Sequence, residues 1–459
     1  MDPCGTGGGA VGPDTALAAD PSSHSAAHLQ GRGEMKREVR RPLRGSQEGQ
    51  ALVLGLVLLM IALATVVVMY NNTQVTTEKV KVVNAADAAA YSGAVFVARN
   101  LNFMAYTNRA MIANHVAAGH YVSISSWVRY MNESMEDLEQ VGDMVWWIPY
   151  VGPWIERITD IMAEVAEQIE EVVDLLGGDV LLPLVDGMGG VMSLAQSAAA
   201  VQSLGGVTVG GFSMPIGTLM REVAQTYDDR IRVNDSGDLG TTEAAIIAAR
   251  IAMENGRIMN VVERTDAASD SGELEQMVDL SLGGSRAWIQ GNRGWSLEPP
   301  VINLVWWLEK RGSTRHLRDG SKLDWDASDE LVHHWFSFDP KDWGWHEDTW
   351  ARGQTRASDL ALGGRYDPIP SYYRTARSEG RGAQDTVLSI TAYCVLPMDA
   401  ARQKPLLGLD SGVDSITHAA VAEIHFQRPR AGFGGDMEEY ANLYNPFWEA
   451  RLASDLVSL

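Results

Sequence analysis

The residues of this chain best suited to chemistry lie in the segment HHWFSFDPKDWGWHEDTW, residues 333–350. It holds three imidazoles, those of His333, His334 and His346, together with carboxylates and four tryptophans. Imidazole and carboxylate groups are ligands for Zn²⁺ and other divalent metals. The chemistry that this segment could support is therefore metal-dependent hydrolysis.

The spacing of these histidines argues against that chemistry. Adjacent residues point to opposite faces of a strand, and on a helix they lie about 100° apart. Neither His-x-His nor His-x-x-x-His spacing occurs in the segment. The competing interpretation is a loop-rich aromatic cluster that fills the core, with the histidines hydrogen-bonded by their neighbours. We therefore predict no metal site, no cofactor and no catalytic residue, and keep the three-histidine hydrolase as an alternative.

Other polar residues give weaker signals. His115 and His120 lie five residues apart on a predicted helix, so we interpret them as ordinary polar positions. Another candidate is an acidic cluster, interpreted as a solvated face with weak cation binding as the alternative: Asp324, Asp326, Asp329 and Glu330. The sequence has no Gly-x-Ser-x-Gly elbow, no phosphate-binding glycine loop and no His-Glu-x-x-His motif.

Composition excludes further classes of function. The 459 residues carry a formal net charge of −22. Phosphate binding needs a clustered positive surface, so we predict no nucleic-acid partner. The two cysteines, Cys4 and Cys394, lie on opposite sides of an apolar segment. They provide neither a disulfide framework nor a zinc site built from cysteines.

That apolar segment, ALVLGLVLLMIALATVVVMY, covers residues 51–70 and contains no charge. Its length suits a helix that crosses a bilayer core of roughly 30 Å. Residues 35–50 supply five basic residues before it, so the positive-inside rule places the N-terminus in the cytoplasm. The alternative is a cleaved signal peptide with its cleavage site at residues 62–64. The apolar run continues six residues further, which favours a membrane anchor.

Beyond the anchor, the segment VVNAADAAAYSGA (residues 82–94) predicts a helix with a smooth face. Gly and Pro are both absent from residues 56–92, so one helix can continue from the membrane through this block. Its small residues recur at every fourth position in two rows: Ala86, Ala90 and Ala94, and Ala85, Ala89 and Gly93. Such a face lets another helix approach closely. That helix belongs either to a partner protein or to a later part of this chain.

The rest of the chain divides by composition, and the predicted fold class is α+β. Residues 155–176 predict an amphipathic helix whose apolar positions alternate steps of four and three, and a second helix is expected over residues 243–263. The segments VINLVWWLEK, DTVLSITAYCVLP and THAAVAEIHFQRP are typical of strands. We expect Met35 to be the biological start. The predicted order is a disordered tail (1–34), a basic cytoplasmic segment (35–50), a transmembrane helix (51–70), extracytoplasmic helices (71–148), a helical region (149–280) and a mixed α/β region (281–459).

The N-terminal residues resemble the start of bacterial TadE/TadG-like Flp pilus-assembly proteins. In that family an RGQALV-like start precedes one membrane helix, and an LQNAADAAALAGA-like helix follows. The first block is matched by Gly49, Gln50, Ala51, Leu52 and Val53. The second block is matched by Asn84, Ala85, Ala86, Asp87, Ala88, Ala89 and Ala90. The resemblance covers residues 45–98, about a tenth of the chain.

The resemblance implies a non-enzymatic, single-pass protein of the bacterial inner membrane that acts in assembling or anchoring a Flp/Tad-type pilus. Its expected partners are the lipid bilayer and pilus-assembly or other envelope proteins. Two alternatives stay open. One is the membrane-anchored hydrolase described above, and the other is an adhesin-like body that binds through the exposed aromatics of residues 325–350.

Overall fold

The computed structural model describes residues 48–145, 180–205, 215–235, 237, 242–262, 264–265, 271–291, 293–298, 302–319, 322–361, 364, 366–370, 372–373, 387–398, 406–408, 412–427 and 441–453. The chain forms two compact units, residues 1–65 and residues 66–459. The predicted tail over residues 1–34 and the predicted helix over residues 155–176 lie outside the described residues.

The longest helix, Glu48–Val145, begins in the first unit and continues into the second, and the other described elements lie in the second unit. The helices are α1 (Glu48–Val145), α3 (Leu181–Gln202), α4 (Pro215–Gln225), α5 (Thr242–Val261), α6 (Ser271–Leu282), α7 (Arg286–Ile289) and α8 (Ala357–Leu360). Short 3₁₀ turns cover Gly283–Ser285, Ile302–Leu304 and Leu406–Gly408. The strands are β1 (Arg232–Val233), β2 (Arg264–Thr265), β3 (Trp295–Leu297), β4 (Trp306–Asp319), β5 (Lys322–Ser337), β6 (Gly344–Arg356), β7 (Tyr372–Tyr373), β8 (Leu388–Pro397), β9 (Ser415–Phe426) and β10 (Trp448–Leu452).

The long helix α1 has 98 residues and confirms the prediction of one helix through the NAADAAA block. It contains no proline, and the hydroxyls of its threonines are satisfied within the helix itself. Thr65 Oγ1 donates to the carbonyl of Ile61, and Thr73 Oγ1 donates to that of Met69. Such back-bonding lets a hydroxyl sit on an apolar helix without an unpaired donor. Residues from about 82 onward become largely buried, whereas most of those before 70 are exposed apolar side chains.

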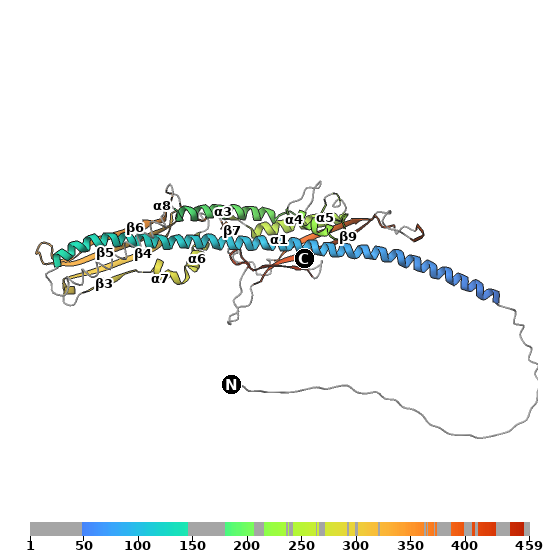
Figure 1. The fold of residues 1–459 in the computed structure, drawn as a ribbon, viewed down its shortest axis with the longest axis horizontal. Helices are drawn as coiled ribbons and strands as arrows, with labels where there is room; N and C mark the ends of the chain where they lie inside the picture. Colours follow the sequence, from blue (N-terminus) through green and yellow to red (C-terminus); the bar gives the residue numbers. More distant parts are fainter. Residues whose placement is uncertain are drawn as a thin grey trace, which may run out of the picture. The chain divides into compact units, whose positions relative to one another are not determined.

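The first sheet has the strand order β1-β8-β9-β10, and all its pairs are antiparallel. Figure 1 shows β9 beside the middle of α1, next to α4 and α5. Nine of the ten residues of β8 are buried, because both faces of the strand are covered. Helix α5 lies against the face of Ser389 and Thr391, and the opposite face belongs to the hydrophobic cluster with α1 and α4. One hydrophobic cluster joins α1, α4, β8 and β9.

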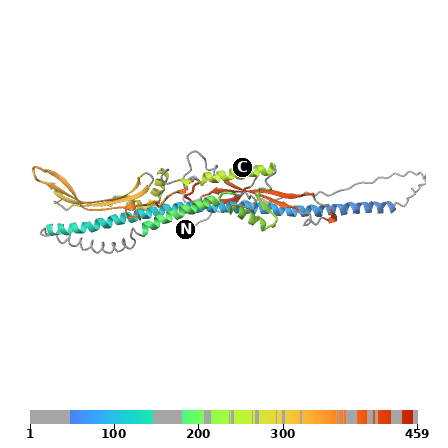
Figure 2. The ribbon, with the colours of Figure 1, turned by 90° about the horizontal axis from the view of Figure 1, so that it is seen from above.

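The second sheet has the order β3-β4-β5-β6 and is also antiparallel. Strands β4 and β5 form a long hairpin, and the pairing of β5 with β6 shifts between Leu331 and Val332, as a β-bulge does. Both Figure 1 and Figure 2 show this sheet alongside the later half of α1. The side chains that join them include Trp325 and Leu331, both buried.

Helix α3 packs on α1 in the opposite direction. The amide of Gln196 donates to the carbonyl of Met104, and the amide of Asn100 donates to the carbonyl of Ala199. As residue numbers increase along α3, those of the contacted residues on α1 decrease, so the two helices are antiparallel. Figure 2 shows them side by side. Helix α5 is fixed to β8 by Glu254, whose Oε1 accepts a hydrogen bond from Thr391 at 2.6 Å.

The α+β class is confirmed, with helices followed by two antiparallel sheets. The strands predicted from the three apolar segments correspond to β4, β8 and β9, and the helix predicted over 243–263 corresponds to α5. The expectation of a loop-rich segment at 333–350 is wrong. Most of it belongs to β5 and β6, because the pairing of β5 with β4 and of β6 with β5 compensates for a sequence rich in polar residues and poor in alternation.

Candidate functional site

The small-residue face of α1 is buried within this chain. Ala85, Ala86, Ala89, Ala90 and Ala94 have no exposed surface. They share one hydrophobic cluster with α4, β8 and β9, which are the elements that cover them. Such a face lets neighbouring elements come close to the helix axis. The described residues thus supply neighbours for this face from within the chain, and a partner helix at this face stays a prediction.

Gly93 shows how close that approach is. A Cβ built on it would lie 3.0 Å from Sδ of Met220 on α4 and 3.1 Å from Cγ2 of Ile390 on β8. The motif residues Asn84 and Asp87 lie earlier on α1, nine and six residues before Gly93. The other motif residues, Gly49, Gln50 and Ala51, lie in the first turn of α1.

The three histidines of the alternative hydrolase interpretation, His333, His334 and His346, are not brought together. Strand β5 places His333 and His334 on opposite faces of the second sheet. The ring of His333 lies 4.2 Å from that of Trp350, and His334 stacks on Trp307 and approaches Glu309 Oε2 at 3.1 Å. His346 instead stacks on Trp335. Among the described residues no group of three or more His, Cys, Asp or Glu side chains could hold a metal ion.

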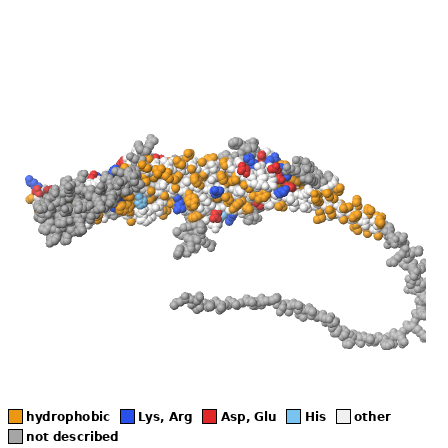
Figure 3. All heavy atoms as spheres, in the orientation of Figure 1, with side chains coloured by type: hydrophobic (Ala, Val, Ile, Leu, Met, Phe, Trp, Pro, Cys, Tyr) orange, Lys and Arg blue, Asp and Glu red, His pale blue; other side chains and the backbone are white. Residues whose placement is uncertain are grey.

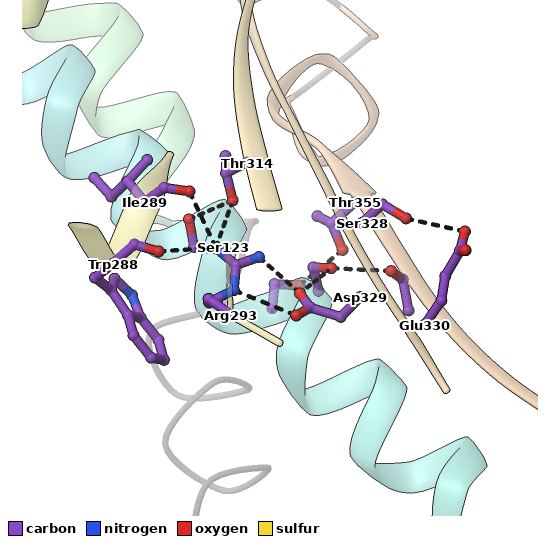
Figure 4. Close-up of polar contacts among 12 residues, drawn as sticks. Ser123, Trp288, Ile289, Arg293, Thr314, Ser328, Asp329, Glu330 and Thr355 are labelled. Carbon is purple, nitrogen blue, oxygen red and sulfur yellow. Dashed lines mark hydrogen bonds and ion pairs between the residues drawn. The ribbon is translucent and has the colours of Figure 1, made fainter. Parts of the chain in front are cut away.

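The strongest polar cluster lies elsewhere, between α1 and the second sheet (Figure 4). Asp329 of β5 is completely buried. Arg293, which precedes β3, donates from Nη2 to Asp329 Oδ2 at 2.7 Å, and Lys310 of β4 donates from Nζ to Oδ1 at 2.6 Å. Ser126 of α1 donates to Oδ2 at 2.9 Å. Two cations and a helix hydroxyl therefore share one buried carboxylate.

The remaining donors of this cluster also have partners. Lys310 Nζ donates to the backbone oxygen of Arg293 at 2.7 Å and lies 5.2 Å from the centre of the Tyr130 ring. Arg293 Nη1 donates to Thr314 Oγ1 at 3.0 Å and to the carbonyl of Ile289. Burial lowers the pKa of Lys310, the ion pair with Asp329 opposes this, and the charge of Arg293 adds to it. Such satisfaction is what makes a buried ion cluster tolerable.

Glycines let α1 come close to this sheet. A Cβ on Gly353 of β6 would collide with the carbonyl oxygen of Ser126 and lie 2.5 Å from the nitrogen of Tyr130. A Cβ on Gly312 of β4 would collide with Oδ1 of Asp329. The absence of these side chains creates the space that the cluster occupies.

A second buried polar contact lies nearer the middle of α1. His115 has no exposed surface, and its Nε2 lies 2.8 Å from Nε2 of His316 on β4. Its Nδ1 lies 2.9 Å from the hydroxyl oxygen of Tyr366, and Trp325 Nε1 donates to its carbonyl. Burial holds the pKa of His115 well below its usual range, and the neighbouring His316 adds to this. Because a neutral imidazole has one donor and one acceptor nitrogen, both rings can stay uncharged here.

Sequence reasoning misjudged two of these groups. Asp329 was assigned to a solvated acidic face, yet it lies on the buried face of β5 with Trp325, Ala327 and Leu331. The period of two along this strand was the signal that could have separated it from its neighbours. The sequence pattern around His115 predicts an ordinary polar position. In the structure it is buried against His316 and Tyr366, which are too distant in sequence for local pattern to reveal the contact. These clusters join α1 to the second sheet.

The described residues contain one helix long and apolar enough to cross a membrane, with a mean hydropathy of 3.0 in its best window and 6% of that window buried. In Figure 3 the first described turns of α1 are almost entirely hydrophobic. Together with the two sheets carried by α1, this defines a membrane-associated α+β protein.

Comparison with known families agrees with this class. Residues 49–96 match the family model described as putative Flp pilus-assembly TadE/G-like. The match contains both sequence blocks of the resemblance and confirms it for this segment. No curated protein and no solved structure gives a significant match. The match relates the N-terminal segment to Flp pilus assembly, and the two sheets lie outside the matched residues.

Proposed function

We propose that this chain is a non-enzymatic, single-pass protein of the bacterial inner membrane that acts in assembling or anchoring a Flp/Tad-type pilus. The observation that carries the proposal is the TadE/G-like match at residues 49–96, which includes the apolar helix and the NAADAAA block. The N-terminus lies in the cytoplasm, and the two sheets lie on the extracytoplasmic side of the membrane. The basic residues that precede the apolar stretch support this orientation.

The way α1 is used supports an anchoring role. The helix that contains the apolar segment also forms the core under the first sheet and contacts the second sheet through Ser126 and Tyr130. A force or a displacement applied to either sheet is therefore carried by one continuous helix. The apolar run continues six residues past residue 64, which favours a retained anchor over a cleaved signal peptide.

Membrane topology is the first test. Single cysteines would replace Ser46 and Glu449 in separate variants, and intact cells would be labelled with a membrane-impermeant maleimide. We expect labelling at position 449 only, because Glu449 is exposed on β10. N-terminal sequencing of the membrane fraction should show no cleavage near residue 64. Labelling at position 46 or a mature N-terminus near residue 65 would contradict the proposed topology.

The role in assembly needs a second test. Deleting the gene in its source organism should abolish or shorten surface Flp pili in electron micrographs, and the full chain should restore them. A chain with residues 51–70 replaced by an unrelated transmembrane segment of equal length separates anchoring from specific recognition. Normal pili in the deletion strain would overturn the proposed role, while leaving the topology result valid.

An adhesin-like binding body is a second candidate, favoured by the turn between β5 and β6. Phe338, Trp343 and Trp345 are exposed there, and their rings contact one another through Phe336. Exposed aromatic clusters are typical of binding surfaces. A Trp343→Ala/Trp345→Ala variant that loses attachment of cells to a surface but keeps its pili would favour this candidate. Unchanged attachment would remove it.

A further inference from the structure

Helix α3 has an apolar face that the described chain leaves uncovered. Its inner face packs towards α1 through Leu182, Val185 and Gln196. On the opposite side, the exposed fraction is 69% for Val191 and 73% for Leu194. The only charged residue of α3 is Asp186, which is half-buried and accepts a hydrogen bond from the backbone of Asp367. Figure 3 shows hydrophobic side chains gathered where α3 lies in Figure 1.

The spacing of the uncovered residues is that of a coiled-coil seam. Six exposed positions follow one another in steps of three and four: Leu184, Gly187, Val191, Leu194, Ala198 and Val201. A seam with this period fits the matching seam of another helix by knobs-into-holes packing. A soluble surface rarely keeps an apolar stripe of this length without a partner. The α3 seam is therefore a docking surface for a helix.

The chain's own predicted helix over residues 155–176 cannot cover this seam by folding back on α3. Folding back through residues 177–179 would place residue 155 beside Val201, and thus beside Asn100, which contacts Ala199. From Asn100 to the end of α1 at Val145 the helix extends roughly 68 Å. The nine residues 146–154 span at most roughly 35 Å. Chain length therefore excludes this occupant.

We infer that a second copy of this chain covers the seam, with the two α3 helices packed in parallel. The parallel direction rests on the proposed anchoring of both copies in one membrane. In this arrangement the a positions are Leu184, Val191 and Ala198, and the d positions are Gly187, Leu194 and Val201. The central layer, with Val191 at a and Leu194 at d, has the combination that parallel dimers favour. Gly187 and Ala198 let the two backbones approach closely. With no charged residue along the seam, a basic or acidic partner would find no complementary group.

Disulfide crosslinking tests the inference in the membrane-embedded full chain. The variants Leu194→Cys and Val191→Cys would each be made in a Cys4→Ser background. Cys394 would be kept, because it is buried. Glu449→Cys is the exposed control away from α3. Under mild oxidation we expect both seam variants to form covalent dimers and the control to remain monomeric. Absence of a dimer at position 194 would overturn the inference.

Two further outcomes separate the competing occupants. In an antiparallel pair that overlaps along the whole seam, position 194 would face position 191. A disulfide that forms between Val191→Cys and Leu194→Cys chains, but in neither variant alone, would therefore overturn the parallel arrangement. An intrachain disulfide in a Met162→Cys/Leu194→Cys variant would show that the chain covers its own seam, because folding back would place position 162 beside position 194.

A second measurement avoids oxidation. Leu194→Glu should convert the detergent-solubilised dimer to a monomer in sedimentation velocity, whereas Leu194→Met should keep the dimer. Because this side chain is exposed, circular dichroism should be the same for both variants. An unchanged sedimentation coefficient for Leu194→Glu would overturn the inference. The labelling tests of membrane topology do not depend on either result, so the two proposals can fail separately.

Discussion

Lys310 Nζ lies 2.6 Å from Asp329 Oδ1, and both residues are almost completely removed from solvent. The contact joins β4 to β5 beneath α1, and Arg293 completes it from the segment before β3. A buried ion pair is weak support for stability by itself, because desolvation opposes the Coulomb attraction. Removing one partner has a much larger effect, since the other charge then stays buried and unpaired.

We therefore predict that Asp329→Asn destabilises the second sheet strongly. Two buried cations lose the carboxylate that they share, which corresponds to a cost of about 3–5 kcal/mol in the free energy of unfolding. Urea denaturation followed by tryptophan fluorescence measures this change, because Trp325 is buried in the adjacent core. Asp326→Asn breaks the exposed pair with Arg356 and should have a much smaller effect on the free energy of unfolding, because solvent screens this pair. Equal effects from the two variants would contradict our description of the cluster.

The close contact between α1 and β6 gives a second prediction. Gly353→Ala should destabilise the chain by about 1–3 kcal/mol, because its new methyl group meets the backbone of Ser126 and Tyr130. Gly256→Ala on α5 is the matched control, since a Cβ there has no neighbour within 4 Å. Alanine in a helix interior should stabilise this control by about 0.5–1 kcal/mol. Melting temperatures of both variants decide the matter, and a stabilising Gly353→Ala would refute the contact.

Stability should fall as the pH falls below about 6.5, because His115 is buried in its neutral form. Its folded pKa is lowered, so the unfolded chain takes up the proton first and acidification favours unfolding. Burial lowers the pKa of His316 as well, although Glu275, Asp279 and Asp324 oppose this. The stabilisation is complete above pH 6.5 and decreases towards the folded pKa.

Melting temperatures at pH 8 and pH 5.5 would measure this effect in the wild type and in His115→Gln. The loss on acidification should be smaller in the variant, whose amide can still bond to Tyr366. His346→Gln leaves the buried pair intact and should follow the wild type. Parallel curves for His115→Gln and the wild type would show that this pair does not cause the dependence.

The buried small-residue face gives a fourth prediction. Ala90→Leu should destabilise the chain by about 1–3 kcal/mol, because β8 and α4 leave no room for a larger side chain. Tyr91→Leu changes the neighbouring position, which is 44% exposed, and should be nearly neutral. Limited proteolysis of membrane-inserted protein reports the difference. If Ala90→Leu resists proteolysis as the wild type does, the face is free to receive a partner helix instead.

Local pattern was sufficient for much of the fold. A charge-free run followed by a region without Gly or Pro determines a long helix, because helix propensity and the absence of breakers act over a few turns. Apolar runs separated by Gly, Pro and charged loops likewise identified β8 and β9. Strands β5 and β6 were missed at residues 333–350, because their stability comes from pairing with β4 and with each other.

The sequence by itself determined the membrane-grade helix, the small face of α1 and the TadE/G-like signature, all of which depend on residues close together in the chain. Only the tertiary structure decided what those residues meet. It placed Asp329 with Lys310 and Arg293, joined His115 to His316 across 201 positions, and put Met220 and Ile390 against Gly93. Long-range contacts set the burial and charge of a side chain, and its neighbours in sequence do not reveal them.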